Sequence, residues 1–430
     1  MKNKEELAYF KKNLGYKRIF RGIYGRYRSL GRLGGRVTLR NLTNEERDIL
    51  SSHLKRDYSR KQSASFSVKL FEESLMHTRF AQYSLEEILE WYFGVDLISK
   101  AEEEVRYLAQ RDRVFQDLFI AHTGEPGESW LDSIIKGQGV GIRRIMVAYS
   151  QDSKLLMQNI RWVCHALKIL DGRVEESPFR LPVLASLVTR DPHAFDVGTL
   201  TGDLLIDALC TLYGVSTPSN SQETAEILYK GGILVDEISN FVTISGLLAY
   251  KEGKRHPVWE AAMNEKEVLQ VPLANLVDIN RIMSPVGKVY IVENPAVFSA
   301  ILDGFIGPNI PPMICSYGQV KLAGLVVLDK LVESGMELYY SGDFDPEGLL
   351  IAHKLGSRYG RNFHLWRYGV EEYGRVISHQ KLSSKRLSIL DSVSCPSFQE
   401  VKDEMRRRER AGYQELLIDK LLKDIVGVMG

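Results

Sequence analysis

The chain has 430 residues, of which 44% are hydrophobic and 26% charged, and its formal net charge is +1. Such a composition is ordinary for a globular protein and leaves room for two or three domains with buried cores. It excludes a membrane protein, because no apolar run approaches the roughly 20 residues that span a bilayer. The amino terminus carries no apolar signal region, so we expect a cytoplasmic protein.

The cysteines are few and widely separated along the chain. They are Cys164, Cys210, Cys315 and Cys395. Zinc-binding cysteines normally come in closely spaced pairs, and no such pair is present. The sequence therefore predicts buried thiols in a reducing compartment, with neither disulfides nor a thiolate metal site.

The first part of the chain is strongly basic. No acidic residue interrupts the segment from Lys11 to Arg40, in which aromatic residues and glycines alternate with the positive charges. Basic and aromatic side chains on flexible backbone are typical of contact with a nucleic-acid backbone. The alternative is a solvated basic face, or a surface for an acidic protein. The candidate DNA-binding residues of this segment are Lys17, Arg18, Arg21, Arg26, Arg28, Arg32 and Arg36.

Short elements follow this basic segment. Residues 36–39 and 66–70 have the pattern of strands, and helices are expected after the caps Thr43 or Asn44 and Ser84. Residues 96–172 have a mostly helical pattern, interrupted by a glycine-rich turn at 137–141. We therefore expect residues 1–180 to form a basic arm and a helical domain.

The middle of the chain has the pattern of a winged helix. Helical segments at 200–212 and 222–230 precede two strand-like runs, 233–235 and 241–244. Helices that end in a small β-ribbon are compatible with that fold. We expect a winged-helix-like DNA-binding domain over residues 181–280, with the turn at 280–287 as its boundary.

The last part, residues 281–430, has a regular α/β pattern. The expected strands are 289–293, 313–316, 337–342 and 363–366, and the expected helices start at 295, 320 and 346. Alternation of this kind predicts a parallel sheet flanked by helices. The fold class is therefore α/β here, with mixed α+β regions before it.

Two strands of this predicted sheet end in carboxylates. Glu293 ends the first, Asp343 and Asp345 end the third, and Asn-Pro or Asp-Pro then starts a helix at each place. If the strands are neighbours, the carboxylates converge at the sheet edge where ligands bind in open α/β folds. Carboxylates this close together repel one another, and a bound hard cation such as Mg²⁺ usually offsets that repulsion. Asp345 has a second interpretation as a helix cap, and Glu347 as a first-turn partner of the helix dipole.

The acidic pattern resembles the Toprim domain of topoisomerases, primases and a group of nucleases. A Glu ends one strand, an Asp-x-Asp ends a later one, and the continuation Asp-Pro-x-Gly is similar to the topoisomerase VI A subunit. Further motifs resemble the bacterial family of paired DUF3323 and DUF2399 domains, which is similar to JetD, the nuclease subunit of Wadjet anti-plasmid systems. These motifs are Gly31–Gly35, Thr38–Thr43, Arg190–Asp196, Val235–Ser239, Glu293–Pro295, Tyr317–Gln319 and Gly342–Asp345.

The resemblance implies a metal-dependent DNA endonuclease. Glu293, Asp343 and Asp345 would be catalytic and would hold Mg²⁺ or Mn²⁺, with Glu347 as a fourth acidic ligand. Gln319 would face the same crevice and contact the DNA backbone, unless its amide only stabilises the turn. The family also implies double-stranded DNA as substrate, a homodimer, and an SMC-type ATPase with kleisin partners as the motor.

Three other interpretations are compatible with parts of the pattern. A topoisomerase VI A-like transesterase would need a tyrosine nucleophile, but Tyr213, Tyr229 and Tyr250 lack the Arg-Tyr-Tyr-like context of such enzymes. A haloacid-dehalogenase-type phosphatase normally has its Asp-x-Asp on the first strand and Thr or Val where Glu347 stands. A non-catalytic DNA-binding Toprim scaffold would be expected to have lost part of the acidic set.

Overall fold

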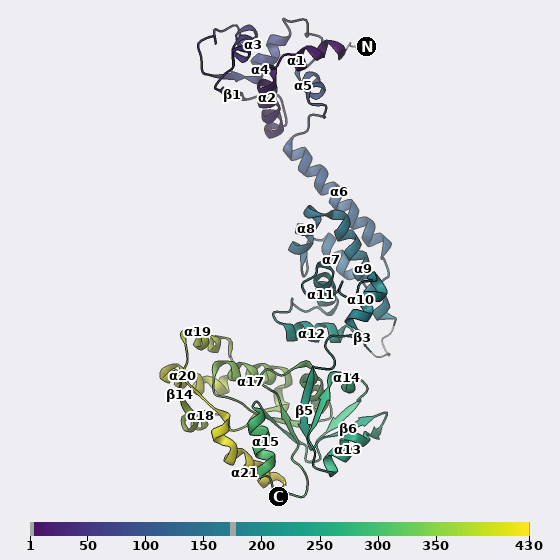
Figure 1. Cartoon of the computed structure of the whole chain (residues 1–430), viewed down its shortest axis with the longest axis vertical. Coiled ribbons are helices and arrows are strands. Elements are labelled where there is room, and N and C mark those ends of the chain that lie inside the picture. Colours follow the sequence, from purple (N-terminus) through teal and green to yellow (C-terminus); the bar gives the residue numbers. More distant parts are fainter. Residues whose placement is uncertain (1–3, 173–177, 430) are drawn as a thin grey trace. The chain divides into compact units, whose positions relative to one another are not determined.

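The computed structural model describes residues 4–172 and 178–429. The chain divides into two compact units, residues 1–123 and 124–430 (Figure 1). Both predicted domain boundaries, near residues 180 and 280, fall inside the second unit. In the described residues no helix is both long and apolar enough to cross a membrane.

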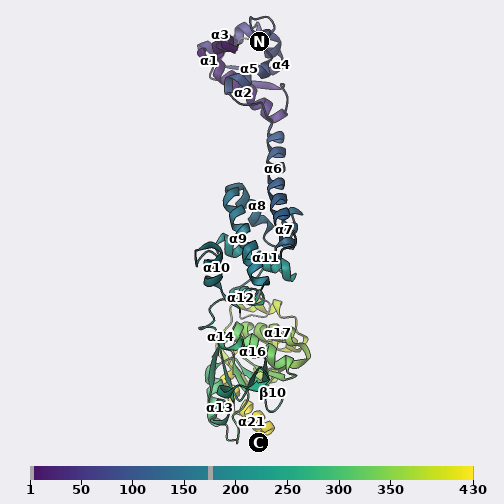
Figure 2. The ribbon, with the colours of Figure 1, turned by 90° about the vertical axis from the view of Figure 1, so that its right-hand side faces the viewer.

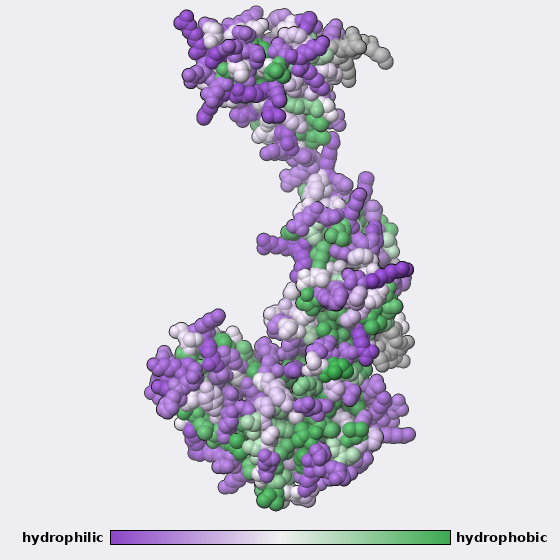
Figure 3. Space-filling model, in the orientation of Figure 1, coloured by the Kyte–Doolittle hydropathy of each residue, from purple (hydrophilic) through white to green (hydrophobic). Residues whose placement is uncertain are grey.

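The first unit packs short helices against a two-stranded antiparallel sheet. Its core consists mainly of aromatic and aliphatic side chains from every element except α6. On the face shown in Figure 3, hydrophilic residues cover most of this unit. Its elements are α1 (Ala8–Lys12), α2 (Tyr16–Leu30), β1 (Arg36–Arg40), α3 (Asn44–Leu54), β2 (Ser63–Ser67), α4 (Val68–Leu75), α5 (Leu85–Phe93) and α6 (Lys100–Ala121).

The local signals for these elements act largely as expected. The side chains of Thr43 and Ser84 accept hydrogen bonds from the third residue of their helices, and Glu46 and Glu87 complete both capping boxes. The strand expected over residues 66–70 is wrong in its second half, because helix α4 begins at Val68.

Helices make up the start of the second unit. The longest of them, α9, buries one face along most of its length. The elements here are α7 (Glu128–Ile135), α8 (Ile142–Gln151), α9 (Ser153–Asp171), β3 (Phe179–Arg180), α10 (Leu181–Thr189), α11 (Leu200–Tyr213) and α12 (Ser221–Lys230).

The β-ribbon expected after α12 does not form. Strand β4 (Ile233–Leu234) pairs in parallel with β3, whereas β5 (Phe241–Ser245) joins the large sheet between β11 and β8. The expected boundary at 280–287 contains β9 (Arg281–Met283), which pairs with β6 (Leu248–Lys251). The predicted strand-like runs 233–235 and 241–244 both form strands, but their partners lie far away in sequence. Residue patterns give no information about such long-range pairing.

A six-stranded sheet forms the centre of the second unit, in the order β13-β12-β10-β11-β5-β8. Strands β10 to β13 are parallel, and β5 and β8 (Leu269–Pro272) extend the sheet in antiparallel fashion. The predicted α/β alternation is therefore confirmed. The other elements here are β7 (Lys254–Arg255), α13 (Pro257–Asn264), α14 (Leu273–Leu276), β10 (Lys288–Val292), α15 (Pro295–Gly304), β11 (Met313–Cys315), α16 (Leu322–Glu333), β12 (Glu337–Ser341), α17 (Pro346–Tyr359) and β13 (Phe363–Leu365).

The helices that follow the parallel strands pack on the sheet and on one another. Helices α16 and α17 lie side by side (Figure 2), linked by the hydroxyl of Tyr359, which donates to Asp329 at 2.9 Å. The last segment returns to the sheet, and its helix α21 packs against α15. This segment contains α18 (Val370–Val376), β14 (Ile377–Lys381), α19 (Ser384–Leu387), α20 (Gln399–Arg408), β15 (Arg410–Gly412) and α21 (Ile418–Met429).

Candidate functional site

The predicted acidic residues lie at the carboxyl ends of two neighbouring strands. Strand β10 has β12 on one side and β11 on the other, and all three are parallel. In the register Val292 lies opposite Ser341, so Glu293 and the Asp343–Asp345 segment leave the sheet at the same edge. From β10 the chain leads first to β11 on one side and then to β12 on the other side. Such a change of direction opens a crevice at the carboxyl edge of the sheet, which is where ligands bind in open α/β sheets.

Glu293 is held by two donors from strand β12 and its following turn. Its Oε2 accepts the backbone N–H of Asp343 at 3.2 Å and the hydroxyl of the buried Tyr340 at 3.3 Å. Its Oε1 has neither a hydrogen bond nor an ion pair with any described residue. One oxygen thus fixes the side chain, and the other remains available to a ligand.

The Asp343–Asp345 segment is clamped as a short extended piece of chain. Phe344 forms an isolated antiparallel bridge with Gly412, with both N–H to oxygen distances at 2.9 Å. Since side chains alternate in extended chain, Phe344 points into the core while its two neighbours point away from it. Oδ1 of Asp343 accepts the backbone N–H of Gln414 at 2.9 Å, so the last segment also positions this carboxylate.

Two glycines make the close approach of the strands possible. A Cβ atom on Gly342 would lie 2.6 Å from Oε2 of Glu293, and one on Gly348 would lie 2.3 Å from the carbonyl oxygen of Asp343. Real Cβ contacts are not that short, so any side chain would push the acidic residues apart. The Gly in Asp-x-Asp-Pro-x-Gly is therefore needed for the turn itself.

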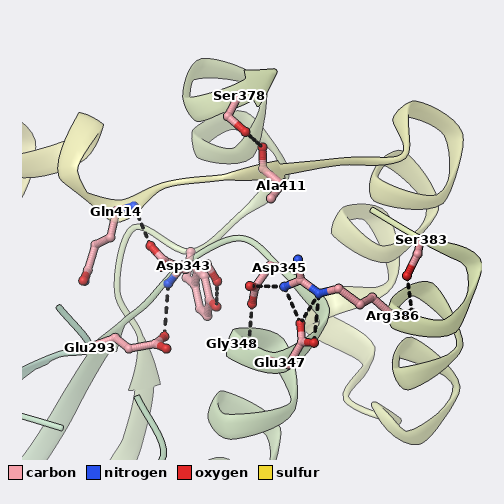
Figure 4. A network of polar contacts seen from close by, with 11 residues as sticks. Glu293, Asp343, Asp345, Glu347, Gly348, Ser378, Ser383, Arg386, Ala411 and Gln414 are labelled. Carbon is pink, nitrogen blue, oxygen red and sulfur yellow. Dashed lines mark hydrogen bonds and ion pairs between the residues drawn. The ribbon is translucent and has the colours of Figure 1, made fainter. Parts of the chain in front are cut away.

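Asp345 is a helix cap, as one of its two predicted interpretations has it, and it also forms an ion pair that the sequence does not predict. Its Oδ1 caps α17 by accepting the backbone N–H of Gly348 at 2.8 Å. Its Oδ2 forms an ion pair with Arg386 at 2.5 Å. The same guanidinium group binds Glu347 through Nε (2.9 Å and 3.1 Å) and Nη2 (2.6 Å). Figure 4 shows Arg386 between these two carboxylates, with Glu293 and Asp343 on the other side of Asp345.

Burial and mutual repulsion perturb the acidic residues. Burial, together with the charges of Asp343 and Asp345, raises the pKa of Glu293 from 4.5 to about 7. Burial, followed by the charges of Glu415 and Asp345, raises the pKa of Asp343 from 3.8 to about 6. Burial also raises the pKa of Asp345, whereas the hydrogen bonds from Arg386 lower the pKa of Glu347. Carboxylates that resist ionisation in this way are typical of functional sites.

A cleft of about 430 Å³ opens beside these carboxylates. Its walls come from α12, α17 and the turn after β11, and Glu293 and Glu347 both line it. Gln319 lies in this cleft as predicted, although its side-chain amide donates to Gln222. Tyr317 and Gly318 both have positive φ, 56° and 80°, which turns the chain back towards Glu293. Lys354 adds a positive charge to the cleft.

The donor set fits a hard divalent cation. Oxygen-only ligands from carboxylates are those that Mg²⁺ and Mn²⁺ prefer, and burial, the main cause of the raised pKa values of Glu293 and Asp343, leaves little water to offset their charge. In the described part of the chain, however, no group of three acidic, His or Cys side chains lies together as a complete metal site. Glu293 and Asp343 offer free oxygens, whereas Arg386 already binds the other two acidic residues and offsets one of their two negative charges.

Six of the seven predicted basic residues lie on a helix or strand of the first unit, and Arg32 lies in the bend between the two elements. Lys17 to Arg28 belong to helix α2 and Arg36 to strand β1. The interleaved aromatic residues were expected to contact nucleic acid, which is wrong for Tyr16 and Phe20, because both are buried in the core of the unit. A helix period buries one face of α2, so its basic residues are left on the other.

Four of the seven basic candidates already have intramolecular partners. Arg18 donates to the Arg40 carbonyl at 2.7 Å and pairs with Glu46, and Arg28 pairs with Glu103. Arg26 donates to the Arg36 carbonyl at 2.7 Å, and Arg36 to that of Ser65 at 2.8 Å. The side chains of Lys17, Arg21 and Arg32 make no hydrogen bond or ion pair with the described residues. These three are therefore the free cations of the predicted set.

Sequence reasoning missed three residues of the site. Tyr340 and Gln414 donate to the acidic residues, and Arg386 pairs with two of them. Tyr340 could have been found, because it is the residue before Ser341 on a predicted strand that leads into the motif. Arg386 and Gln414 follow the motif by dozens of residues and carry no local pattern.

The Asp191-Pro192-His193 motif forms a local turn. The carboxylate of Asp191 accepts the backbone N–H of His193 at 2.9 Å, and the imidazole pairs with Asp196 at the same distance. Both contacts are exposed. They account for the motif by turn geometry.

Comparison with known families places the chain. Residues 33–249 match the family described as protein of unknown function N-terminus (DUF3323), and residues 269–425 match protein of unknown function C-terminus (DUF2399). The chain therefore belongs to the family in which these two domains are paired. A search of curated proteins found no match.

Proposed function

We propose that this protein is a metal-dependent DNA endonuclease that cleaves phosphodiester bonds by hydrolysis. The observation that supports this most is the meeting of Glu293, Asp343 and Asp345 at the carboxyl edge of β10 and β12. The resemblance of these positions to the Toprim motif supports phosphoryl-transfer chemistry over other uses of an acidic cluster.

The residues have separate roles in the proposed reaction. A bound divalent ion would lower the pKa of a coordinated water and stabilise the leaving 3′-oxygen. Glu293 and Asp343 would hold that ion through their free oxygens, while Tyr340 and the Gln414 backbone keep both carboxylates oriented. The amino terminus of α17 lies behind Asp345 and favours a phosphate nearby. Asp345 caps that helix and is the third acidic residue of the set.

DNA contact is part of the proposal. In the cleft next to Glu293, Gln319 and Lys354 offer donors to a phosphate, and a bound cation would offset the carboxylates of Glu223 and Glu226 that line it as well. Lys17, Arg21 and Arg32 of the first unit are free to add sequence-independent contacts. We further propose double-stranded DNA as substrate, a cytoplasmic location, a homodimer with one site per strand, and an SMC-type ATPase with kleisin partners as motor, in a Wadjet-like defence complex.

The direct test is the cleavage of supercoiled plasmid by the purified protein with Mg²⁺ or Mn²⁺. We expect nicked or linear product, no covalent protein–DNA species, and full inhibition by EDTA. Protein attached to the cut end would instead support a topoisomerase VI A-like transesterase. DNA binding without cleavage, in the presence of a partner ATPase, would support a non-catalytic scaffold.

A further inference from the structure

The four acidic side chains divide into two pairs by the state of their oxygens. In the first pair, Glu293 and Asp343, one oxygen of each carboxylate is fixed by a neutral donor and the other has no partner among the described residues. In the second pair, Asp345 and Glu347, three of the four oxygens bind Arg386 and the fourth caps α17. Of these four residues, only Glu293 and Asp343 therefore keep carboxylate oxygens that are free to bind a ligand.

The guanidinium group of Arg386 occupies the place of a cation between Asp345 and Glu347. It binds Glu347 with two nitrogens and Asp345 with one, all within 3.1 Å. Such forked contacts between a planar guanidinium and carboxylates are stronger and more directional than those of a Lys. Arginine also keeps its charge at every accessible pH, so one of the two negative charges of this pair stays offset under all conditions in which the protein is folded.

The surroundings hold Arg386 in this position. It belongs to helix α19, whose cap is the hydroxyl of Ser383, and its side chain is about one-third exposed, whereas that of Asp345 is 20% exposed. The side chain of Glu347 is 46% exposed, so removing the guanidinium charge would cost most at the more shielded Asp345, whose charge would lose its compensation. A second metal ion could bind between Asp345 and Glu347 only by displacing Arg386, at this cost in free energy.

We propose that Arg386 is the resident second cation of this site, so that each chain binds one divalent ion, at Glu293 and Asp343. Two-metal nucleases place a second ion to neutralise charge at the scissile phosphate; here the guanidinium group would supply positive charge beside the acidic residues in place of that ion. Arg386 is therefore a positioning residue for Asp345 and Glu347. This inference rests on the proposed metal-dependent function, and it sets the number of divalent ions bound per chain at one.

The test is to count bound Mn²⁺ on the full chain. Metal-free protein is titrated with Mn²⁺ by calorimetry, and bound metal is measured after equilibrium dialysis. We expect one ion per chain for the wild type, one for Arg386→Lys, which keeps the charge, and two for Arg386→Met, which keeps the side-chain length but removes the charge. Circular dichroism controls for the fold of each variant.

The possible outcomes separate the claim about Arg386 from the nuclease proposal. Two ions in the wild type, or one ion in a folded Arg386→Met variant, would overturn the role of Arg386 and leave the nuclease proposal intact. No bound ion in any variant would overturn the nuclease proposal itself. If Arg386→Met does not fold, electron paramagnetic resonance of the wild type decides: we expect the spectrum of an isolated Mn²⁺, and a spin-coupled pair would contradict the inference.

Discussion

The backbone N–H of Asp343 donates a hydrogen bond to Oε2 of Glu293 at 3.2 Å. This contact joins the ends of two strands whose residues are fifty positions apart in sequence. It shows that the two halves of the acidic motif share one edge of the sheet. It also explains why Glu293 is fixed in place although its charge has no cationic partner.

The first prediction concerns the turn that carries the Asp-x-Asp motif. Gly348→Ala should destabilise the second unit by about 1–3 kcal/mol, because its Cβ would lie 2.3 Å from the Asp343 carbonyl oxygen. Urea denaturation measures the change. Gly374→Ala is the matched control, since its Cβ would meet nothing within 4 Å in helix α18 and should stabilise by about 0.5–1 kcal/mol. Equal effects of the two substitutions would contradict the packing of this turn.

The α/β pattern and the acidic set were accessible from the sequence because both depend on local signals. The apolar runs of β10 and β12 mark buried strands, and Asn294 and Asp345 cap their helices as predicted. The partners of β4 and β5 were not accessible, because strand pairing depends on contacts between distant residues. Arg386 could not be predicted for the same reason, because its neighbours in sequence give no indication of the carboxylates that it binds.

The aromatic residues of the first unit illustrate a different limit. Tyr16 and Phe20 alternate with basic residues in the sequence, a pattern that nucleic-acid contact and an amphipathic helix share. The structure buries both rings in the core of the unit. Composition therefore indicated the charge of this surface, but it did not separate the residues that build the helix from those that remain exposed.

The second prediction concerns pH. The folded protein raises the pKa of Glu293 to about 7 and that of Asp343 to about 6, above the values of an unfolded chain. Their protonated forms are favoured by folding, so the stability they contribute is lost as pH rises through 6–7. Without metal, the melting temperature should fall between pH 5 and pH 8.

Divalent metal should reverse this loss. Mn²⁺ binds ionised carboxylates, so it should raise the melting temperature more at pH 8 than at pH 5.5. Thermal unfolding with and without Mn²⁺ at both pH values measures the effect. In the Glu293→Gln variant the metal-free pH dependence should be weaker. An Mn²⁺ shift that is the same at both pH values in the wild type would contradict the assigned pKa values or the site.

The third prediction concerns the basic surface of the first unit. Replacing Lys17, Arg21 and Arg32 together by Ala removes cations that have no partner in the described structure, so the fold should be preserved. DNA affinity should fall, and the slope of log K against log salt should decrease by about 2 to 3. Fluorescence anisotropy with a duplex at several salt concentrations measures both.

A matched triple substitution controls for net charge. Lys154, Arg161 and Lys254 are exposed residues of the second unit whose side chains form no hydrogen bond or ion pair with the described residues, and their replacement by Ala removes the same charge. An equal loss of affinity in this control would show that net charge alone matters. No loss in the first triple variant would assign the basic surface to a protein partner instead.

The central claim is that Glu293 and Asp343 perform metal-dependent DNA hydrolysis. Plasmid cleavage in Mn²⁺ tests it most directly, with Glu293→Gln and Asp343→Asn as isosteric variants and the exposed Asp303→Asn as control. We expect cleavage by the wild type and the control, and a loss of at least a hundredfold in both site variants, because each removes a charged ligand of the ion. Undiminished cleavage by a folded Glu293→Gln or Asp343→Asn variant would contradict the assignment.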